Sequence, residues 1–220
     1  MGRLGPGIGI VVGLRAEARL ARLFGAPVEA GGGTAAGAEA AAERLIETGV
    51  RGLVSFGLAG GLDPALRPGD LLVPERVLSH AGSWATDPAL RHALGPGCGG
   101  PVFGGGAVLA TAAAKREMHA RTGAVAVDLE SAAVAHAASR HGLPFAVLRA
   151  VCDPADRDLP RAALVALDGA GRIGAWRVLG AVAARPREVP ALLGLGADAA
   201  RARRALAARL RRLRSGPHAR

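Results

Sequence analysis

The chain has 220 residues, enough to bury a sizeable core in one domain. Half of its residues are apolar, which excludes a disordered chain, and its 33 glycines show no three-residue period, which excludes collagen. The two cysteines form no C-x-x-C pair, so we expect reduced thiols and a cytoplasmic protein. We also expect no membrane span, because no run of about 18 apolar residues is free of charge. We expect no signal peptide, because residues 5–13 are short, glycine-rich and lead directly into charged residues.

The net charge of +10 is unevenly distributed. Residues 198–220 contain eight arginines and one acidic residue, whereas residues 1–197 carry a net charge of only +3. We therefore predict a catalytic domain over residues 1–197 and a basic helical tail over residues 198–220.

Apolar runs alternate with segments of helical spacing along the chain. The apolar runs predict strands at residues 8–12, 51–56, 71–77, 107–110, 125–127 and 144–151. Helices are predicted at residues 15–24, 35–48, 112–121 and 130–140 and throughout the region after Pro160, with Thr34 capping the second helix. Residues 84–104 are rich in Gly and Pro and predict a loop. This alternation predicts a layered α/β domain with a largely parallel sheet.

Four loops follow predicted strands and carry the residues with chemical potential. They are residues 13–17, 57–61, 128–131 and 152–156. In open α/β sheets, ligands bind beyond the carboxyl ends of the strands, so these loops are the candidates for a binding site. Each loop alone also has an ordinary structural explanation, as a helix start or a turn.

Three segments together resemble a known superfamily. They are residues 53–77 (LVSFGLAGGLDPALRPGDLLVPERV), 126–134 (AVDLESAAV) and 144–156 (PFAVLRAVCDPAD). With their V-x-x-E-[SA] pattern and an apolar strand ending in R-x-x-x-D, they look like the purine nucleoside phosphorylase and methylthioadenosine nucleosidase superfamily. The resemblance implies a three-layer αβα sandwich with a mixed, mostly parallel sheet and, here, a C-terminal helical extension.

Within that superfamily the chain looks most like the hopanoid-associated phosphorylases. The likeness lies in the start GIGIVVGLRAEARLAR, the G-G-G-T beginning at Gly31 and the Ala/Arg-rich helical end. It implies phosphorolysis of adenosylhopane with release of adenine, inorganic phosphate as co-substrate, no other cofactor, no metal and a homo-oligomer. The alternative in the same class is a hydrolytic 5′-methylthioadenosine/S-adenosylhomocysteine nucleosidase.

The resemblance assigns roles to individual residues. Adenine leaves readily only when its ring is protonated, and Asp153 matches the acid that protonates it. Glu130 matches the glutamate that binds the ribose hydroxyls, and Leu129 replaces the usual Met against the sugar. Gly60 and Val108 are expected to line the substrate site.

The nucleophile stays open between phosphate and water, and we expect phosphate. Gly13, Arg15 and Gly57 are the candidates for holding it, since glycines expose backbone N–H groups and Arg binds phosphate with two hydrogen bonds. Leu58 weakens this expectation, because the family often has Ser or Thr there. Glu17 lies near the family's water-activating glutamate, with the register displaced by one residue, and is the candidate base of a hydrolase.

Three further residues receive no catalytic role. Asp128 neighbours the ribose glutamate but is expected to point elsewhere. Cys152 is expected to be a small buried hydrophobe, because no His neighbours it to make a thiolate. His80 is expected to be solvated, and the six histidines show no metal-binding spacing.

The basic tail, residues 198–220, is compatible with two placements of its helix and with one further binding function. Its apolar stripe consists of Ala199, Ala202, Leu206, Leu210 and Leu213. Such a stripe among arginines suits either docking on the domain or a helix in an anionic lipid interface, which would bring the enzyme to the inner face of the membrane and to a lipid-linked substrate. The third reading is a nucleic-acid-binding tail, which we disfavour because the arginines alternate with Leu and Ala and not with aromatic residues.

Overall fold

The computed structural model describes residues 7–166 and 186–215. The strands are β1 (Ile8–Val12), β2 (Val28–Ala30), β3 (Gly52–Gly61), β4 (Leu71–Leu72), β5 (Arg76–Ser79), β6 (Gly82–Ala85), β7 (Val102–Gly104), β8 (Ala126–Asp128) and β9 (Phe145–Asp153). The helices are α1 (Arg15–Ala21), α2 (Ala35–Glu47), α3 (Pro88–Leu94), α4 (Ala112–Thr122), α5 (Ser131–Arg140), α6 (Arg161–Ala166) and α8 (Val189–Ser215). Short 3₁₀ turns cover Arg22–Phe24 and Pro186–Glu188.

The sheet is mixed and mostly parallel, as predicted. Its centre is β3, which pairs in parallel with β1 on one side and with β9 on the other. Strand β8 pairs antiparallel with the last residues of β3, through Gly60 and Gly61. Because β8 runs back along β3, Glu130, which follows it, lies beside Gly13 at the end of β1 and contacts Arg149 on β9.

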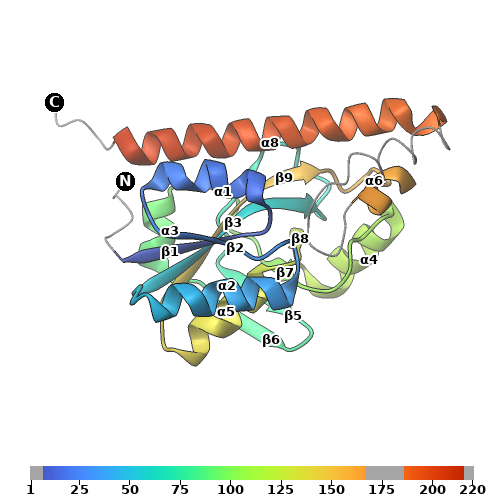
Figure 1. The fold of residues 1–220 in the computed structure, drawn as a ribbon. Helices are drawn as coiled ribbons and strands as arrows, with labels where there is room; N and C mark the ends of the chain where they lie inside the picture. Colours follow the sequence, from blue (N-terminus) through green and yellow to red (C-terminus); the bar gives the residue numbers. More distant parts are fainter. Residues whose placement is uncertain (1–6, 167–185, 216–220) are drawn as a thin grey trace.

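Helices cover both faces of the sheet, which confirms the three-layer prediction (Figure 1). One core packs α1, α3 and α8 against β1, β3 and β9, and the other packs α2 and α5 against the opposite face of the same strands. Alternate residues of β9 divide between the two cores, since Ala146 and Leu148 face the first and Val147 the second.

Helix starts follow the sequence closely. The Thr34 side chain accepts a hydrogen bond of 3.1 Å from the Gly37 N–H, which confirms the predicted cap of α2. Thr111 caps α4 in the same way, accepting from the Ala114 N–H at 3.2 Å. This cap fixes where α4 begins and therefore where its buried Lys115 lies.

Two of the predicted elements are wrong. Residues 107–110 form no strand, because Gly105 and Gly106 adopt positive φ angles of 92° and 88° and turn the chain out of the sheet after β7. Residues 84–104 are not a continuous loop, since they contain α3, capped by Asp87 with Pro88 in its first turn. The predicted strand 71–77 is two strands, β4 and β5. Strands β2, β6 and β7 were not predicted, and β7 lies within the predicted loop 84–104.

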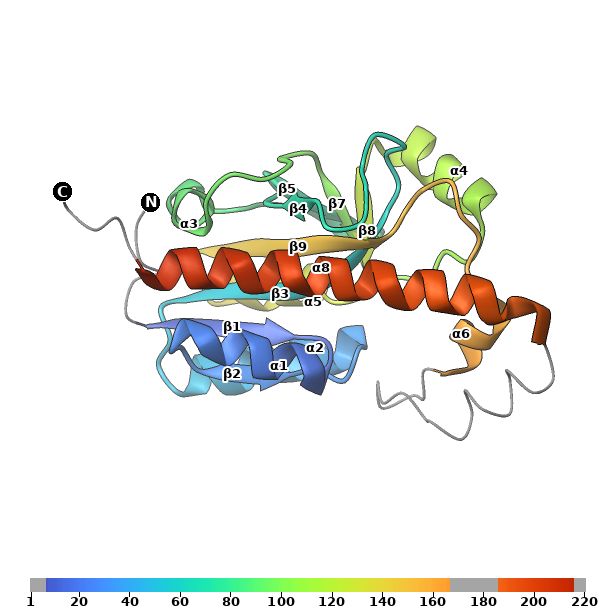
Figure 2. The same ribbon diagram turned by 90° about the horizontal axis from the view of Figure 1, so that it is seen from above.

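Helix α8 runs lengthwise along β9 and β3 on one face of the sheet (Figure 2). Ala202, Leu206 and Leu210 are fully buried in the first core, and the Arg209 side chain donates to the carbonyl oxygens of Leu94 and Pro96 at the end of α3. The apolar stripe is thus docked on the domain. The proposed boundary between residues 197 and 198 falls inside this helix.

Candidate active site

A cavity of about 550 Å³ lies at the ends of β3, β8 and β9, where the four predicted loops meet. Six of the predicted site residues line it: Glu17, Gly60, Val108, Leu129, Glu130 and Asp153. Gly13, Arg15 and Gly57 are not among its lining residues, and Arg15 is exposed. The structure therefore brings together the predicted acid, the ribose glutamate and the candidate base, but it does not bring Arg15 to them.

Asp153 ends β9 at one side of the cavity. Its side chain is buried, and its Oδ2 accepts a hydrogen bond of 2.5 Å from the Lys115 ammonium on α4. Its Oδ1 is buried and has no hydrogen-bond partner among residues 7–166 and 186–215. This carboxyl group thus has one anchored oxygen and one oxygen available to a ligand.

Arg149 organises the opposite side of the cavity. This fully buried guanidinium lies on β9, with Nε 2.8 Å from Asp128 Oδ2 and Nη2 3.1 Å from Glu130 Oε2. Nη2 also donates to Ser55 Oγ at 2.8 Å. Asp128 itself accepts from the backbone N–H of Ser131 at 2.9 Å, so it fixes the start of α5 while it holds the arginine.

Glu17 is positioned by backbone donors from two loops. Its Oε2 accepts from the Leu14 N–H at 2.8 Å, across the first turn of α1, and its Oε1 accepts from the Leu58 N–H at 3.0 Å. Burial leaves 6% of the residue exposed. The carboxylate is therefore held at the point where α1 and β3 meet.

The two glycines predicted to hold phosphate make room for charged side chains. A Cβ atom on Gly13 would lie 2.5 Å from Glu130 Oε1 and 3.2 Å from Glu17 Oε2. A Cβ atom on Gly57 would lie 2.5 Å from an Arg149 nitrogen and 2.6 Å from Glu17 Oε1. A glycine is required at both positions because larger residues would displace these charged groups.

Burial and neighbouring charges shift the pKa values of Glu130 and Arg149. Burial raises the pKa of Glu130 to about 7 against the opposing effect of Arg149, and the nearby carboxylates of Asp128 and Glu17 add to the rise. Burial would lower the pKa of Arg149, but the surrounding carboxylates outweigh burial and raise it. Glu130 therefore exchanges its proton near neutral pH, while Arg149 stays charged.

The same physical cause acts on Asp153. Burial raises its pKa, and the hydrogen bond and charge of Lys115 oppose the rise without cancelling it. A carboxyl group that keeps its proton more strongly than usual suits a general acid.

The rest of the cavity wall is apolar. It is lined by Val108 and by six leucines, which are Leu14, Leu58, Leu109, Leu159, Leu164 and Leu195. Val108 and Leu164 are 42% and 37% exposed, so the apolar surface continues to the outer edge of the cavity. The cavity thus combines a charged floor with an apolar wall.

Lys115 and Arg149 received no role from the sequence. Asp128 was expected to point away from the site, and this is wrong, because it lines the cavity and pairs with Arg149. Lys115 and Arg149 each had a usable signal. Lys115 is the sole lysine in a chain with 28 basic residues, and Arg149 is the sole charge within the apolar strand FAVLRAV. An ionised side chain inside a buried strand requires a buried partner, which Asp128 supplies.

The remaining side chains that were set aside lie where their chemistry is ordinary. Burial raises the pKa of the Cys152 thiol to about 12, with the nearby Asp153 carboxylate adding to the effect, so this thiol is no nucleophile at neutral pH. His80 is exposed and its ring packs against Phe103 outside the cavity lining. Within the described part of the chain, no three His, Cys, Asp or Glu side chains gather as a metal site requires.

Comparison with known proteins assigns the chain to a family. Residues 26–88 and 89–170, more than half of the chain, match the profile of the family described as the Phosphorylase superfamily.

Solved structures share the fold at low sequence identity. A futalosine hydrolase from Helicobacter pylori is 20% identical with a TM-score of 0.65, over 80% of this chain and 97% of that one. A 5′-methylthioadenosine/S-adenosylhomocysteine nucleosidase from the same organism, in complex with a substituted pyrrolidin-3-ol, gives the same identity, TM-score and coverages. The corresponding nucleosidase from Colwellia psychrerythraea, bound to adenine, is 21% identical with a TM-score of 0.62, over 71% of this chain and 86% of that one.

Proposed function

The chain belongs to the phosphorylase superfamily, and from this premise we propose that it releases adenine from a 5′-substituted adenosine by breaking the N-glycosidic bond. One observation carries the proposal. The buried carboxyl group of Asp153, which has a raised pKa and one oxygen without a partner among the described residues, lines the same cavity as the carboxyl groups of Glu130 and Glu17. These are the groups needed to protonate a base, hold a sugar and direct a nucleophile.

Bond cleavage begins at Asp153. As the bond between the sugar C1′ and the purine N9 breaks, its electron pair moves into the purine ring. The proton on Asp153 passes to N7, so adenine leaves as a neutral molecule. The burial of Asp153 keeps this proton on the acid until the purine arrives.

The sugar end of the cavity is arranged for a positive charge. The ribose becomes similar to an oxocarbenium ion as the bond breaks, and Glu130 in its ionised form accepts hydrogen bonds from the 2′- and 3′-hydroxyls. Asp128, Glu130 and Glu17 place three carboxyl groups around the one guanidinium of Arg149. Such an excess of acidic groups stabilises a cationic transition state more than the neutral substrate.

We propose water as the nucleophile, with Glu17 as the general base. Water adds its oxygen to C1′ and gives one proton to Glu17, and the products are adenine and the free 5′-substituted ribose. The sequence alone favoured phosphate, but Arg15 lies outside the cavity lining. Gly13 adjoins the carboxylates of Glu130 and Glu17, and although Gly57 adjoins Arg149 as well as Glu17, three carboxyl groups already surround that guanidinium. An anion entering this end of the cavity meets like charge, which disfavours its binding.

Product identification in the presence and absence of inorganic phosphate tests this proposal. We expect adenine release at equal rates in both buffers and free 5′-substituted ribose as the sugar product. A ribose 1-phosphate derivative, formed only with phosphate, would show phosphorolysis. An absence of adenine from a panel of 5′-substituted adenosines, including 5′-methylthioadenosine and a 5′-alkyl adenosine, would refute the function itself.

We propose an apolar 5′ substituent, with adenosylhopane as the substrate that the sequence resemblance indicates. The apolar wall, which reaches the outer edge of the cavity through Val108 and Leu164, supports this assignment. Each CH₂ group buried against such a wall contributes about 0.8 kcal/mol, or nearly fourfold in affinity. We therefore expect KM to fall steadily across a series of adenosines with 5′-alkyl chains of increasing length, and Val108→Ser to flatten the series.

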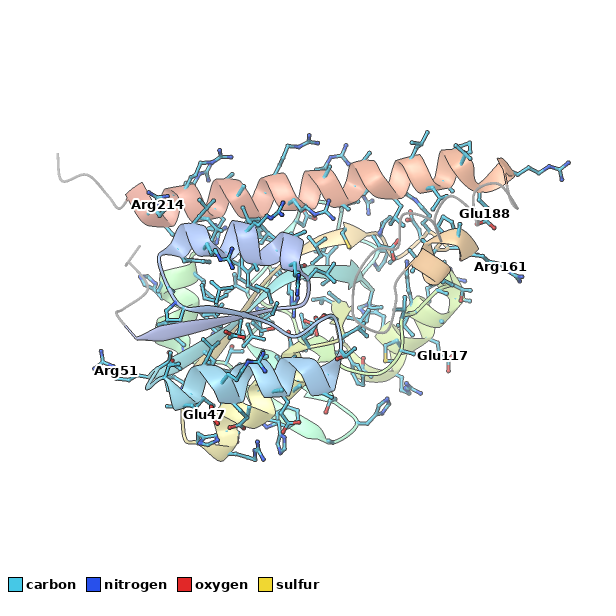
Figure 3. All side chains as sticks on the ribbon, in the orientation of Figure 1. Glu47, Arg51, Glu117, Arg161, Glu188 and Arg214 are labelled. Carbon is cyan, nitrogen blue, oxygen red and sulfur yellow. The ribbon has the colours of Figure 1, made fainter. Side chains whose placement is uncertain are left out.

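A lipid-linked substrate would bring the enzyme to a membrane surface. Within residues 7–166 and 186–215 no helix has the length and apolarity for crossing a bilayer, and the Leu stripe of α8 is buried. Surface contact would therefore depend on the exposed arginines of α8, among them Arg204, Arg212 and Arg214, the last labelled in Figure 3. We expect R204E/R212E/R214E to reduce co-sedimentation with phosphatidylglycerol vesicles at low salt, and unchanged recovery would exclude this contact.

A further inference from the structure

Lys115 is an unusual residue for a cavity lining, because lysine side chains are rarely buried. Its side chain is 1% exposed, and its three N–H groups donate to three different oxygens. These acceptors are Asp153 Oδ2 at 2.5 Å, the Pro154 carbonyl at 2.9 Å and the Arg157 carbonyl at 2.8 Å. An ammonium group has three donors and no acceptor, so this group is fully satisfied and stays in one place.

The position of Lys115 determines which oxygen of Asp153 a ligand can reach. Oδ2 is tied to the ammonium, and Oδ1 is buried without a partner in the described residues. Rotating the carboxyl group would break the bond to Lys115 and leave a buried charge unpaired, which is costly. Any proton destined for a purine in this cavity therefore leaves from Oδ1.

We propose that Lys115 is a positioning residue for the general acid. It holds Oδ2 so that the reactive proton sits on Oδ1, and its charge stabilises the carboxylate that remains after the proton has passed to the purine N7. In that step the Oδ1–H bond breaks and the N7–H bond forms, while Lys115 keeps all three of its protons. This inference depends on the proposed release of adenine.

The choice of lysine at this position supports the role. The other 27 basic residues of the chain are arginines, so the composition of this protein favours Arg wherever either residue would serve. A planar guanidinium cannot direct three donors to three acceptors around one atom, whereas an ammonium group can. The site therefore requires the geometry of lysine in addition to its charge.

Other charges near Asp153 largely balance one another. Arg157, on the segment after β9, and Asp198, on α8, form an ion pair of 2.6 Å and act on Asp153 in opposite directions. Cys152 is a neutral thiol beside it. Lys115 is consequently the main group that favours the ionised form of Asp153 against burial.

Lys115→Met, which keeps the length of the side chain and removes the charge, tests the proposal. Two substrates are compared: the 5′-substituted adenosine that the wild-type enzyme cleaves and the 4-nitrophenyl riboside with the same 5′ group. Nitrophenolate leaves without being protonated, so it needs no acid. We expect K115M to lose about 10²-fold in kcat/KM on the adenosine and less than about threefold on the nitrophenyl riboside.

The pH profile gives a second readout. Without the ammonium, the pKa of Asp153 rises further, so the basic limb of the kcat/KM profile moves to higher pH. Met118→Ala is the matched control, because it weakens the packing of a buried residue on the same helix without contacting Asp153. We expect M118A to lower the melting temperature while leaving the two-substrate ratio and the pH limb unchanged.

Equal losses on both substrates, or an unmoved basic limb, would overturn the role of Lys115. If K115M does not fold, the double variant K115M/D153N replaces it, because it buries no unpaired charge. A residue acting only through Asp153 adds no further loss of adenine release to D153N, whereas an additional loss refutes the proposal. Wild-type enzyme that releases no adenine would instead refute the proposed function, and the role of Lys115 with it.

Discussion

The two ends of the cavity both place carboxyl groups against one buried cation, but the number of carboxyl groups per cation differs. At one end the carboxyl group of Asp153 faces the ammonium of Lys115, and at the other end Asp128, Glu130 and Glu17 surround one guanidinium. Both cations are 1% exposed. What differs is the ratio of acidic to basic groups. It is one to one at the end formed by Asp153 and Lys115, here called the base end because the purine base is proposed to bind there. It is three to one around Arg149, here called the sugar end.

This difference separates two tasks within one cavity. A balanced pair can release a proton and keep the resulting carboxylate stable, because its counter-charge is already in place. An acidic excess attracts a developing positive charge and disfavours an anion. Under the proposed function, leaving-group protonation and sugar stabilisation would thus be carried out by similar side chains whose surroundings differ.

The largest expected effect comes from Asp153→Asn, which breaks the base end alone. Asn has the same size but cannot supply the proton, so adenine release should fall by about 10²–10⁴-fold. The measurement is adenine formation under saturating substrate, with the nitrophenyl riboside as the control that needs no acid. A D153N enzyme with near wild-type kcat on the adenosine would remove Asp153 from the mechanism.

Arg149→Met breaks the sugar end and should be the most destabilising change there. It leaves Asp128 and Glu130 buried without their cation, and breaking a buried pair in this way typically costs about 3–5 kcal/mol in the free energy of unfolding. Denaturant unfolding measures it. The control is Arg44→Ala, which removes an exposed pair with Glu29 and should cost less than about 1 kcal/mol. Similar losses for both would show that the arginine does not hold the cluster together.

Gly13→Ala disturbs the sugar end more gently. The added methyl group would lie 2.5 Å from Glu130 Oε1 and must displace it. We expect about a tenfold loss in kcat/KM for a ribonucleoside, equivalent to about 1.4 kcal/mol, and a smaller loss for its 2′-deoxy analogue. Gly196→Ala on α8 is the control, since its methyl group would meet no atom within 4 Å and activity should not change. An equal loss for both nucleosides would mean that Glu130 does not contact the 2′-hydroxyl.

The last expected effect concerns stability alone and is a pH dependence. Folded Glu130 keeps its proton to about pH 7, whereas an unfolded chain releases it near the ordinary value of 4.5. The folded state therefore binds more protons between these values, and the contribution of Glu130 to the free energy of unfolding decreases as the pH rises through them. Glu130→Gln cannot ionise and should flatten this slope in denaturant titrations at pH 5 and pH 7.5. An unchanged slope in E130Q would assign the effect to another group.

The sequence predicted well those parts of the structure that local pattern determines. Apolar runs located β1, β3 and β9, and Thr34 and the motif around Glu130 located helix starts. What it missed depends on the third dimension. Nothing near Lys115 in the chain indicates its contact with Asp153, which is 38 residues away. The sequence around Gly57 likewise does not show that Glu17 and Arg149 occupy the space beside this glycine, which was predicted to hold phosphate.

The same limit applies to the tail. The stripe of Ala202, Leu206 and Leu210 has the same spacing whether it faces lipid or protein, so the pattern alone could not decide between them. The decision came from β9, whose Ala146, Leu148 and Ala150 leave an apolar strip that α8 covers.

Helix α8 also has a consequence for the biosynthesis of this protein. It follows every other described element in the chain, yet it covers one face of the central strands and donates from Arg209 to the end of α3. On the ribosome, Phe56, Leu148 and their neighbours must wait with that face open to solvent until α8 has emerged from the exit tunnel. We therefore expect the nascent chain to present an apolar surface that chaperones can bind. We also expect a chain that stops before α8 to be prone to degradation, although every described residue of the cavity lining except Leu195 has already been translated.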